Sequence, residues 1–561
     1  MRLNILQNRL SRIVVILPAL ASLFVTTKIN IDPVNLPKMV LISIVSGYLL
    51  GILISGKFFD LRRDKFLLFS ALAILFALIV STFLSDSPLV QVFYGSWARN
   101  TGLLTYLCLL IILIASAAVN QNKFFEISIL SLAFAGLFNV FYGFLQVNGI
   151  DPVDWNNTFN AIIGTLGNPN FSSAFIAISL LTYPCIYFGI EGKFKRSLVV
   201  VLFLVSLYAI YLTKSQQGYI FLATGGAVIV NIYLMKKLRL KVFGKVVLAG
   251  TGVGFIASIA GILQKGPLAD YLYQPSVSLR GFYWQAGLDM FKDSPIYGKG
   301  LDAYGDLYLR FREPASVLPP GGPGVFSNAA HNVLIDMAAS GGLLLLIPYV
   351  VILFYALVLA VRVLKLIEFD WVFVTLLSCW VAFQFELIIS INQIGLAVWV
   401  WALTGLLIAR SKWLLEGQRE THQKSAPAPN RKEPISPSAF LITAATTIVF
   451  SLAALPEQVA DMNFKSSMQS KNVERVVKAI DSFPASSERM SRASQVLLRS
   501  SLNDYALSIS QKAIEFNPNH LNSWITLAYN PSASKEDRVK AKQNLMRLDP
   551  LSDEWTKLEI K

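Results

Sequence analysis

The chain has 561 residues, of which 54% are hydrophobic and 15% charged, a composition typical of polytopic membrane proteins and not of water-soluble domains. The formal net charge is +15, but Lys and Arg lie in short clusters between apolar runs and form no continuous basic face. We therefore expect no nucleic-acid partner. Cys108, Cys185 and Cys379 all fall within apolar runs, so the sequence indicates no disulfide framework.

Apolar runs along the chain predict about thirteen transmembrane helices, since about 20 apolar residues cross a bilayer. They lie near residues 13–27, 39–56, 66–84, 102–118, 125–147, 171–190, 197–213, 219–235, 246–264, 343–361, 371–391, 394–410 and 438–456. The first run follows a basic start, as in a signal peptide, but Ile13–Leu17 is shorter than the roughly 7–15 apolar residues that such a peptide needs. We therefore expect a retained first helix.

The basic residues of the loops are unevenly divided between the two sides. On the side of the N-terminus they form clusters such as Lys57–Lys65, Lys193–Arg196 and Lys236–Lys245. The short loops of the other side hold four basic residues: Lys28, Lys38, Arg99 and Lys214. The positive-inside rule then predicts a cytoplasmic N-terminus, and thirteen spans place the C-terminal domain outside.

This topology predicts an all-α membrane protein with two soluble parts on the outer face. The predicted parts are 1–264 with helices one to nine, 265–342 as a large outward loop, 343–412 with helices ten to twelve, 413–437 as a cytoplasmic linker, 438–456 as helix thirteen, and 457–561 as an outward helical domain. A connection as long as the large loop is unusual, and such loops are often functional.

Three short outward segments carry polar residues next to predicted spans. They are "YGSWARNTG" (Tyr94–Gly102), "GTLGNPNFSS" (Gly164–Ser173) and "TKSQQGY" (Thr213–Tyr219). Each has a structural alternative. Arg99 can be an interfacial anchor that snorkels. The Asn-Pro-Asn segment can be a turn before a helix. Gln216 can satisfy the backbone of its turn.

Glu386 lies near the outer end of the eleventh run, in "QFELIISINQIG". A carboxylate within a span is costly and usually marks a pathway or a site, although a protonated or paired structural acid is the alternative. In the large loop, we expect Asp302, Asp306, Arg310 and Arg312 to include ordinary solvated charges.

His331 is one of only three histidines and precedes a long apolar run. Ser327 or Asn328 can cap a helix that starts near Ala329, which would place His331 in the first turn. The helix dipole there disfavours a charged ring, and a neutral imidazole can accept a proton from a hydroxyl. The alternative is a histidine that is only packed or hydrogen-bonded at the membrane interface.

The segments "WARNTGL", "GTLGNPN", "TKSQQG", "LRGFYWQAGLDMFKDSPIYGKGLDAYG" and "HNVLIDMAASGGLLLLIPY" resemble the O-antigen ligase and polymerase superfamily, which includes bacterial O-linked oligosaccharyltransferases. The resemblance covers about residues 10–412 and is most specific across 280–342. It implies a glycosyltransferase of the bacterial cytoplasmic (inner) membrane, active in the synthesis of cell-surface polysaccharide such as lipopolysaccharide. The donor would be a glycan on a polyprenyl (undecaprenyl) diphosphate carrier, the acceptor a hydroxyl on the outer face, and no metal or cofactor would be needed.

Two catalytic residues follow from the resemblance. His331 matches a histidine proposed to activate the acceptor, and Arg280 matches an arginine thought to hold the donor diphosphate, a task for which the planar guanidinium is suited. The family commonly has an arginine where this chain has Gln216, so Lys214 or Arg99 would supply the missing charge. Further candidates for substrate binding are Asn332, Glu386 and Arg310.

The C-terminal segment "ALSISQKAIEFNPNHLNSWITLAY" matches the tetratricopeptide pattern at Ala506, Ala513, Pro518, Trp524 and Leu527. A helical-repeat array offers a concave surface for a peptide, protein or glycan partner, and the alternative is a domain that only steadies the outer face. Ligase, polymerase and protein O-oligosaccharyltransferase share the donor and differ in the acceptor, which is a lipid, a glycan or a protein.

Two functions of other classes remain open. One is a polysaccharide or lipid transporter or flippase, and the other is a non-catalytic scaffold. The transporter is disfavoured because the polar residues gather at one face instead of the midplane and because no internal repeat is visible.

Overall fold

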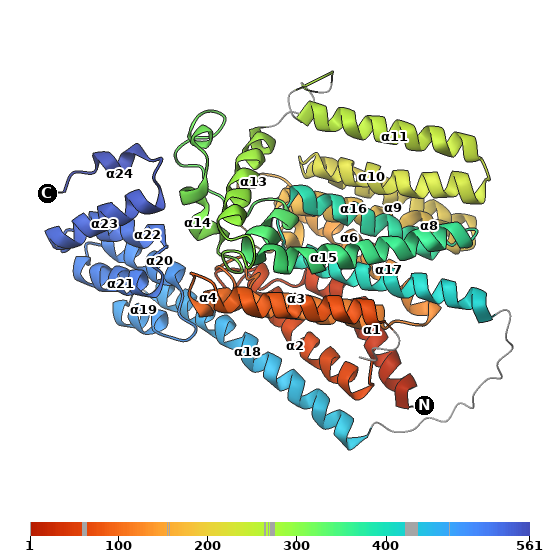
Figure 1. Cartoon of the computed structure of the whole chain (residues 1–561), viewed down its shortest axis with the longest axis horizontal. Coiled ribbons are helices and arrows are strands. Elements are labelled where there is room, and N and C mark those ends of the chain that lie inside the picture. The colour runs from red at the N-terminus through yellow and green to blue at the C-terminus, as the bar shows by residue number, and fades with distance from the viewer. Residues whose placement is uncertain are drawn as a thin grey trace.

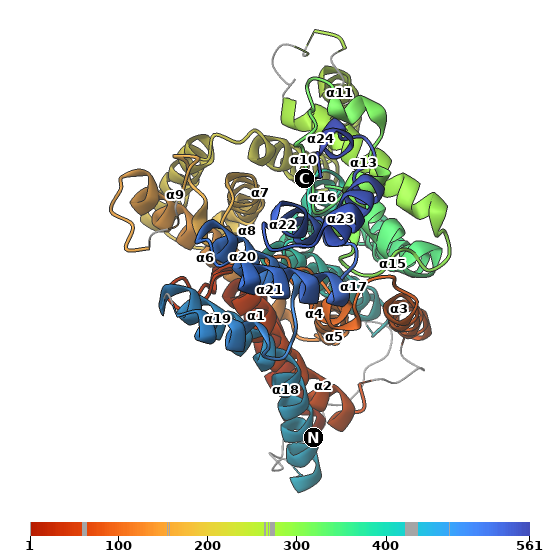
Figure 2. The same cartoon turned by 90° about the vertical axis from the view of Figure 1, so that its left-hand side faces the viewer.

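The computed structural model describes residues 2–58, 64–153, 155, 157–262, 265–267, 269, 275–420, 436–470 and 472–560. Within these ranges every regular element is a helix (Figure 1), which confirms the all-α prediction. The long helices run side by side in one bundle, and the C-terminal helices cover one end of it, away from the N-terminus (Figure 1). Figure 2 views the bundle from that end, which we call the loop end.

Each of the thirteen predicted apolar runs lies mainly within helical structure. The corresponding elements are α1 (Arg2–Leu23), α2 (Asn35–Ser55), α3 (Lys65–Phe83), α5 (Leu103–Ala117), α6 (Asn122–Val147), α7 (Pro169–Leu180) with α8 (Tyr183–Gly189), α9 (Lys193–Leu212), α10 (Gln217–Ile232) with η2 (Tyr233–Lys237), α11 (Lys241–Ile262), α15 (Val333–Leu366), α16 (Trp371–Ile389), α17 (Ile394–Glu420) and α18 (Pro437–Ser470). In the described residues, ten helices are long and apolar enough to cross a membrane, and α5 is a shorter apolar helix. The chain is therefore an all-α polytopic membrane protein.

The remaining helices are not among the thirteen predicted spans. They are α4 (Leu89–Tyr94), η1 (Gly164–Leu166), α13 (Pro275–Asp293), α14 (Tyr304–Phe311), η3 (Pro314–Val317), α19 (Val473–Ile480), α20 (Ser487–Arg499), α21 (Asn503–Phe516), α22 (Leu521–Tyr529), α23 (Lys535–Leu548) and α24 (Asp553–Lys557).

Helix bounds differ from the predicted span bounds in three places. The helix α17 continues past residue 412 to Glu420, α18 runs unbroken across residues 456 and 457, and α15 begins ten residues before position 343. Residues 421–435 of the predicted linker lie outside the described residues. The division into domains stays a prediction.

Polar segments that are far apart in sequence meet at the loop end. The Asn35 side chain donates a hydrogen bond to the carbonyl of Ala98 at 2.7 Å, and Gln393 donates to Asn35 at 3.1 Å. The Lys38 ammonium donates to the carbonyl of Thr165 at 3.0 Å. The outward segments of the predicted topology thus share one end of the bundle, and the side of the membrane that this end faces stays a prediction.

The "DSPIYGKG" segment crosses α15 at a break in that helix. Gly342 has a φ of 60° and leaves the helical conformation, and the loop after α13 crosses the helix there. The amides of Leu343 and Leu344 donate to the carbonyls of Pro295 and Ile296 at 2.8 and 3.1 Å, which satisfies donors that the break frees. A Cβ atom at Gly342 would lie 2.3 Å from the Ile296 carbonyl carbon, so only glycine fits without a shift of the backbone.

The C-terminal helices are fixed to the loop end by buried polar contacts. Arg489 pairs with Glu457 at 2.7 Å, and both side chains are at most 7% exposed. Asp461 accepts hydrogen bonds from the Ile31 amide at 2.7 Å and from the Trp97 indole at 3.2 Å. The helices α20 to α23 pack on one another in chain order, an arrangement that a helical repeat would have. The tetratricopeptide assignment itself stays a prediction.

Candidate active site

Helix α13 presents Arg280, Tyr283 and Trp284 toward the same side, because residues three and four positions apart are neighbours on a helix. Arg280 is 8% exposed. Within the described residues, its guanidinium makes no hydrogen bond and no ion pair. Burial lowers the pKa of Arg280, and the negative charge of Glu386 partly opposes this effect. A buried cation without a partner is costly, and an anionic ligand would relieve that cost.

His331 lies just before α15, and the predicted helix start near Ala329 is wrong. The helix begins at Val333, and its cap is Asn332, whose side-chain oxygen accepts from the Leu334 and Ile335 amides at 3.0 and 3.2 Å. The Ser327 hydroxyl instead donates to the carbonyl of Ala329 at 2.6 Å, within a local turn. Asn332 is thus used by the helix cap and orients the chain at His331.

The backbone of His331 is held in the left-handed region, with a φ of 54°. A non-glycine residue there costs on the order of 1 kcal/mol or more and persists only where its surroundings fix it. The Trp284 indole donates to the His331 carbonyl at 3.4 Å, the Tyr283 ring centroid lies 5.3 Å from the imidazole centroid, and the Asp336 carboxylate accepts from the Ala330 amide at 2.7 Å. These contacts set the position of the ring.

The imidazole of His331 is neutral at physiological pH. Burial of the ring, together with the positive charges of Arg280 and Arg99, lowers the pKa of His331 from 6.5 to about 3. The neutral ring that we expected from the sequence thus has another cause, which is burial and two guanidinium groups instead of a helix dipole. A neutral imidazole has a free lone pair that can accept a proton.

Arg99 belongs to a buried ion pair and is not an interfacial anchor. Its Nε atom lies 2.7 Å from Asp302, and the two side chains are 8% and 2% exposed. Asp302 also accepts from the Ser96 amide at 2.8 Å. The expectation that Asp302 is solvated is therefore wrong, because the turn that carries Arg99 closes over it. One terminal nitrogen of Arg99 is buried without a partner in the described part of the chain.

Glu386 is completely buried in α16, and neither of its carboxylate oxygens has a hydrogen-bond partner among the described residues. Its charge acts on Arg280, so the structure brings Glu386 to the Arg280 side of the site. The site therefore combines α13, α15, α16 and the turn after α4.

Three other candidates lie at exposed positions. Lys214 and Gln216 are exposed in the turn between α9 and α10, a turn that the Ser215 hydroxyl ties to Asn170 at 2.7 Å. Arg310 is exposed on α14, where its guanidinium lies over the ring of Phe311 at 5.6 Å. Its neighbour Arg312 is buried and paired, so our expectation of a solvated charge is wrong for Arg312.

Sequence reasoning missed Tyr283, Trp284 and Asp336. A signal for the two aromatic residues was available in the sequence, because they follow Arg280 by three and four residues, the spacing of neighbours on one face of a helix. Asp336 also follows Asn332 by four residues, but its bond to the Ala330 amide depends on the irregular backbone before α15, which no periodicity reveals.

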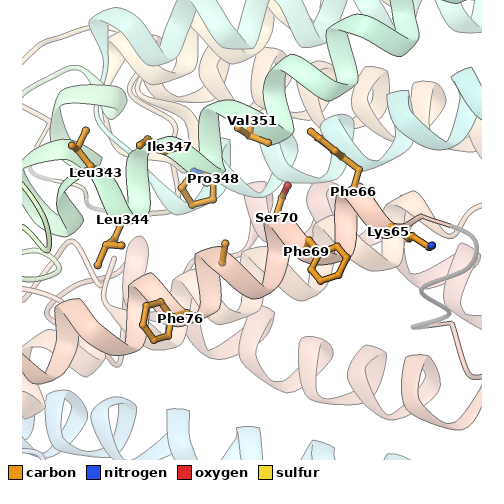
Figure 3. Close-up of a pocket in the computed structure, with 11 residues that line it drawn as sticks. Lys65, Phe66, Phe69, Ser70, Phe76, Leu343, Leu344, Ile347, Pro348 and Val351 are labelled. Atoms are coloured by element: carbon orange, nitrogen blue, oxygen red, sulfur yellow. The ribbon is translucent and has the colours of Figure 1, made fainter.

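An apolar groove of about 600 Å³ opens between α3 and α15 (Figure 3). It is lined by Lys65, Phe66, Phe69, Ser70, Ala73, Phe76, Leu343, Leu344, Ile347, Pro348 and Val351. Leu343 lies ten residues after the start of α15, about 15 Å at 1.5 Å per residue. The groove thus runs along the bundle away from the His331 end of that helix.

Residues 201–350 match the O-antigen ligase family. Over this stretch, about a quarter of the chain, the sequence is similar to O-antigen ligases. The match contains Arg280, His331 and the turn with Gln216, whereas Arg99 and Glu386 lie outside it, so it is narrower than the resemblance seen in the sequence. No curated protein sequence matches the chain. The family match and the apolar helices together indicate a multi-pass membrane protein that is similar to O-antigen ligases.

Proposed function

We propose that the chain transfers a glycan from a polyprenyl diphosphate carrier to an acceptor hydroxyl, as a step of cell-surface polysaccharide ligation or polymerisation. The reaction would take place at the loop end, on the outer face of the bacterial cytoplasmic membrane. One observation supports the proposal: in the segment that matches the O-antigen ligase family, a buried arginine with no partner among the described residues lies near a neutral histidine. An arginine of this kind suits a diphosphate, and a histidine of this kind suits proton removal.

In the proposed step, the acceptor oxygen forms a bond to the anomeric carbon while its proton passes to a ring nitrogen of His331. The bond between the anomeric carbon and the diphosphate oxygen breaks, and the electron pair stays on the diphosphate. Arg280 stabilises the negative charge that grows there. Attack from the side opposite the leaving group inverts the anomeric configuration.

The charges of the site couple the base to the donor. In the free protein, Arg280 and Arg99 keep the pKa of His331 low, so the ring is a weak base. A bound diphosphate brings negative charge to Arg280 and thereby offsets the cations that disfavour protonation. His331 would then become a stronger base only when the donor is in place.

The groove between α3 and α15 supports a donor with a lipid tail (Figure 3). Its lining is apolar except for Lys65 and Ser70, which suits an isoprenoid chain that enters from the membrane. The proposed donor would thus lie with its tail along α15 and its diphosphate near Arg280.

The donor role of Arg280 is tested by comparing two arginine variants of the same loop in nanodiscs with a polyprenyl-diphosphate-linked glycan. Arg280→Gln should lower kcat/KM for the donor by about tenfold to a hundredfold, the equivalent of a charged hydrogen bond of about 1.5–3 kcal/mol. Arg310→Gln, which removes an exposed charge, is the matched control and should leave the rate unchanged. Equal rates for the two variants would refute the role of Arg280.

A protein O-oligosaccharyltransferase shares this donor chemistry and remains the second candidate. A protein acceptor would give the C-terminal helices, which pack on the loop end, a role in acceptor binding. A transporter is supported by none of the contacts at the loop end.

A further inference from the structure

A second cavity, of about 720 Å³, lies between the loop end of the bundle and the C-terminal helices. One wall comes from α4, the Trp97 turn, α14 and the segment that leads to His331, and the other from α20, α22 and α24. Figure 1 shows the C-terminal helices beside α4 and α14. Its volume falls within the roughly 300–1,000 Å³ of small-ligand pockets, which suits a short chain segment and is too small for a folded partner.

The two walls are joined by buried polar contacts. Arg312 pairs with Asp549 at 2.7 Å, and the side chains are 0% and 5% exposed. The same guanidinium donates to the carbonyl of Pro323 at 3.0 Å, which fixes the segment leading to His331. Asp306 accepts from Gln91 at 2.8 Å and from Asn517 at 2.9 Å. The cavity is therefore preformed and includes the C-terminal domain as part of its wall.

The cavity leads toward the proposed base. Asn328 lines it and precedes His331 by three residues, so their Cα atoms are at most about 11 Å apart. Packed aromatic rings connect the cavity lining to His331. The centroid of Phe326, which also lines the cavity, lies 6.3 Å from Tyr308, Tyr308 lies 5.6 Å from Tyr283, and Tyr283 lies 5.3 Å from His331.

The cationic groups of the lining are already engaged by other side chains. Glu488 lies 2.6 Å from Arg492 and 3.2 Å from His520. Burial opposes ionisation of Glu488, but His520 and Arg492 outweigh it and lower its pKa to about 2, so this carboxylate stays ionised. The guanidinium of Arg492 also lies over the Trp97 ring at 4.1 Å. An anionic ligand would thus find no free cation among the described lining residues.

The groups that remain available are amides and aromatic rings. Asn328 and Asn522 are exposed, and within the described residues their side chains make no hydrogen bond. Phe326 is 57% exposed. Amides both donate and accept hydrogen bonds, as hydroxyl groups require, and aromatic rings provide apolar faces for C–H groups. A ligand that combines hydroxyls with C–H faces and no charge is a neutral oligosaccharide.

We propose that this cavity binds the acceptor as a neutral oligosaccharide segment, with the reacting hydroxyl directed toward His331. The proposal rests on the proposed transferase function and assigns the C-terminal domain a direct part in acceptor binding. It explains why Arg312 links that domain to the segment before His331.

The test measures binding without turnover, on the full chain in nanodiscs carrying His331→Ala. The probe is the neutral oligosaccharide fraction released by mild acid from the surface polysaccharide of the producing cells, titrated by calorimetry. Combined Asn328→Ala and Asn522→Ala, or Phe326→Ala alone, should weaken binding at least tenfold. Arg499→Ala, which removes an exposed arginine of α20 outside the cavity lining, should not. Both asparagine side chains are exposed and unbonded, so these variants should fold, and a thermal melt checks that they do.

Absence of binding to the parent, or equal binding by the cavity variants and the control, would overturn the proposal. Binding of a Ser- and Thr-rich peptide that the same variants abolish, with no binding of the oligosaccharide, would assign the cavity to a polypeptide and also overturn it. In the active protein, the cavity variants should raise KM for the acceptor and leave kcat and donor hydrolysis unchanged. Normal binding in a chain that proves inactive with every lipid-linked donor would instead refute the transferase function.

Discussion

The ion pair between Arg312 and Asp549 should control how firmly the C-terminal domain is docked. Arg312→Met removes the guanidinium and leaves a carboxylate that is 5% exposed without its cation. Loss of one partner of a buried pair costs about 3–5 kcal/mol, and Arg312 in addition loses its bonds to the carbonyls of Pro323 and Val325. A cost of about 4 kcal/mol corresponds to a roughly thousandfold shift of the docking equilibrium.

Hydrogen exchange in nanodiscs measures this shift. The amides of α20 to α24 should exchange much faster in Arg312→Met than in the parent, and the acceptor KM should rise with kcat for donor hydrolysis unchanged. The matched control is Arg310→Met, which removes an exposed arginine two residues away. The double variant Arg312→Met with Asp549→Leu should recover most of the lost protection, because it leaves no buried charge unpaired. If Arg312→Met and Arg310→Met exchanged alike, the ion pair would not be what docks the domain.

Two further predictions concern the neutral histidine and the break in α15. The pKa of His331 is about 3 in the folded state and about 6.5 in the unfolded chain, so between these pH values only the unfolded state binds the proton. The free energy of unfolding should therefore fall as the pH drops below 6.5, by up to about 2 kcal/mol at pH 5. His331→Gln should lose less stability in the same unfolding titration. Gly342→Ala should destabilise the protein by about 1–3 kcal/mol, because the φ of Gly342 is 60° and an added Cβ would meet the Ile296 backbone. The control is Gly322→Ala, whose Cβ would meet nothing within 4 Å. Equal melting temperatures for the two variants would contradict this prediction.

The helices of the bundle were predictable because a bilayer-spanning helix needs a long apolar run, and such runs can be read directly from the amino-acid sequence. The burial of Arg312 was not, because its partner lies 237 residues further along the chain and belongs to another domain. The start of α15 was misplaced for a local reason. Ser327 and Asn332 can both cap a helix, and only the folded chain shows that Ser327 serves a turn.

The site could be predicted in part. His331 and Arg280 were proposed from family motifs, and their roles stay predictions. The cost of a buried carboxylate pointed to Glu386, which the structure shows to be completely buried. Arg99 was found as well, but its pairing with Asp302 depends on the closure of a turn that the sequence does not specify. The cavity between the loop end and the C-terminal helices was not foreseen, since its lining comes from residues 90–98, 305–328 and 457–555, which meet only through tertiary docking.

The central claim, that His331 is the base of a glycan transfer, is tested most directly by a single-turnover reaction of His331→Ala with a lipid-linked donor already bound. We expect donor binding to persist and the rate of transfer to fall by at least about a hundredfold, the usual contribution of a positioned general base. Transfer at the rate of the unaltered chain, with the donor bound and the protein folded, would contradict the account.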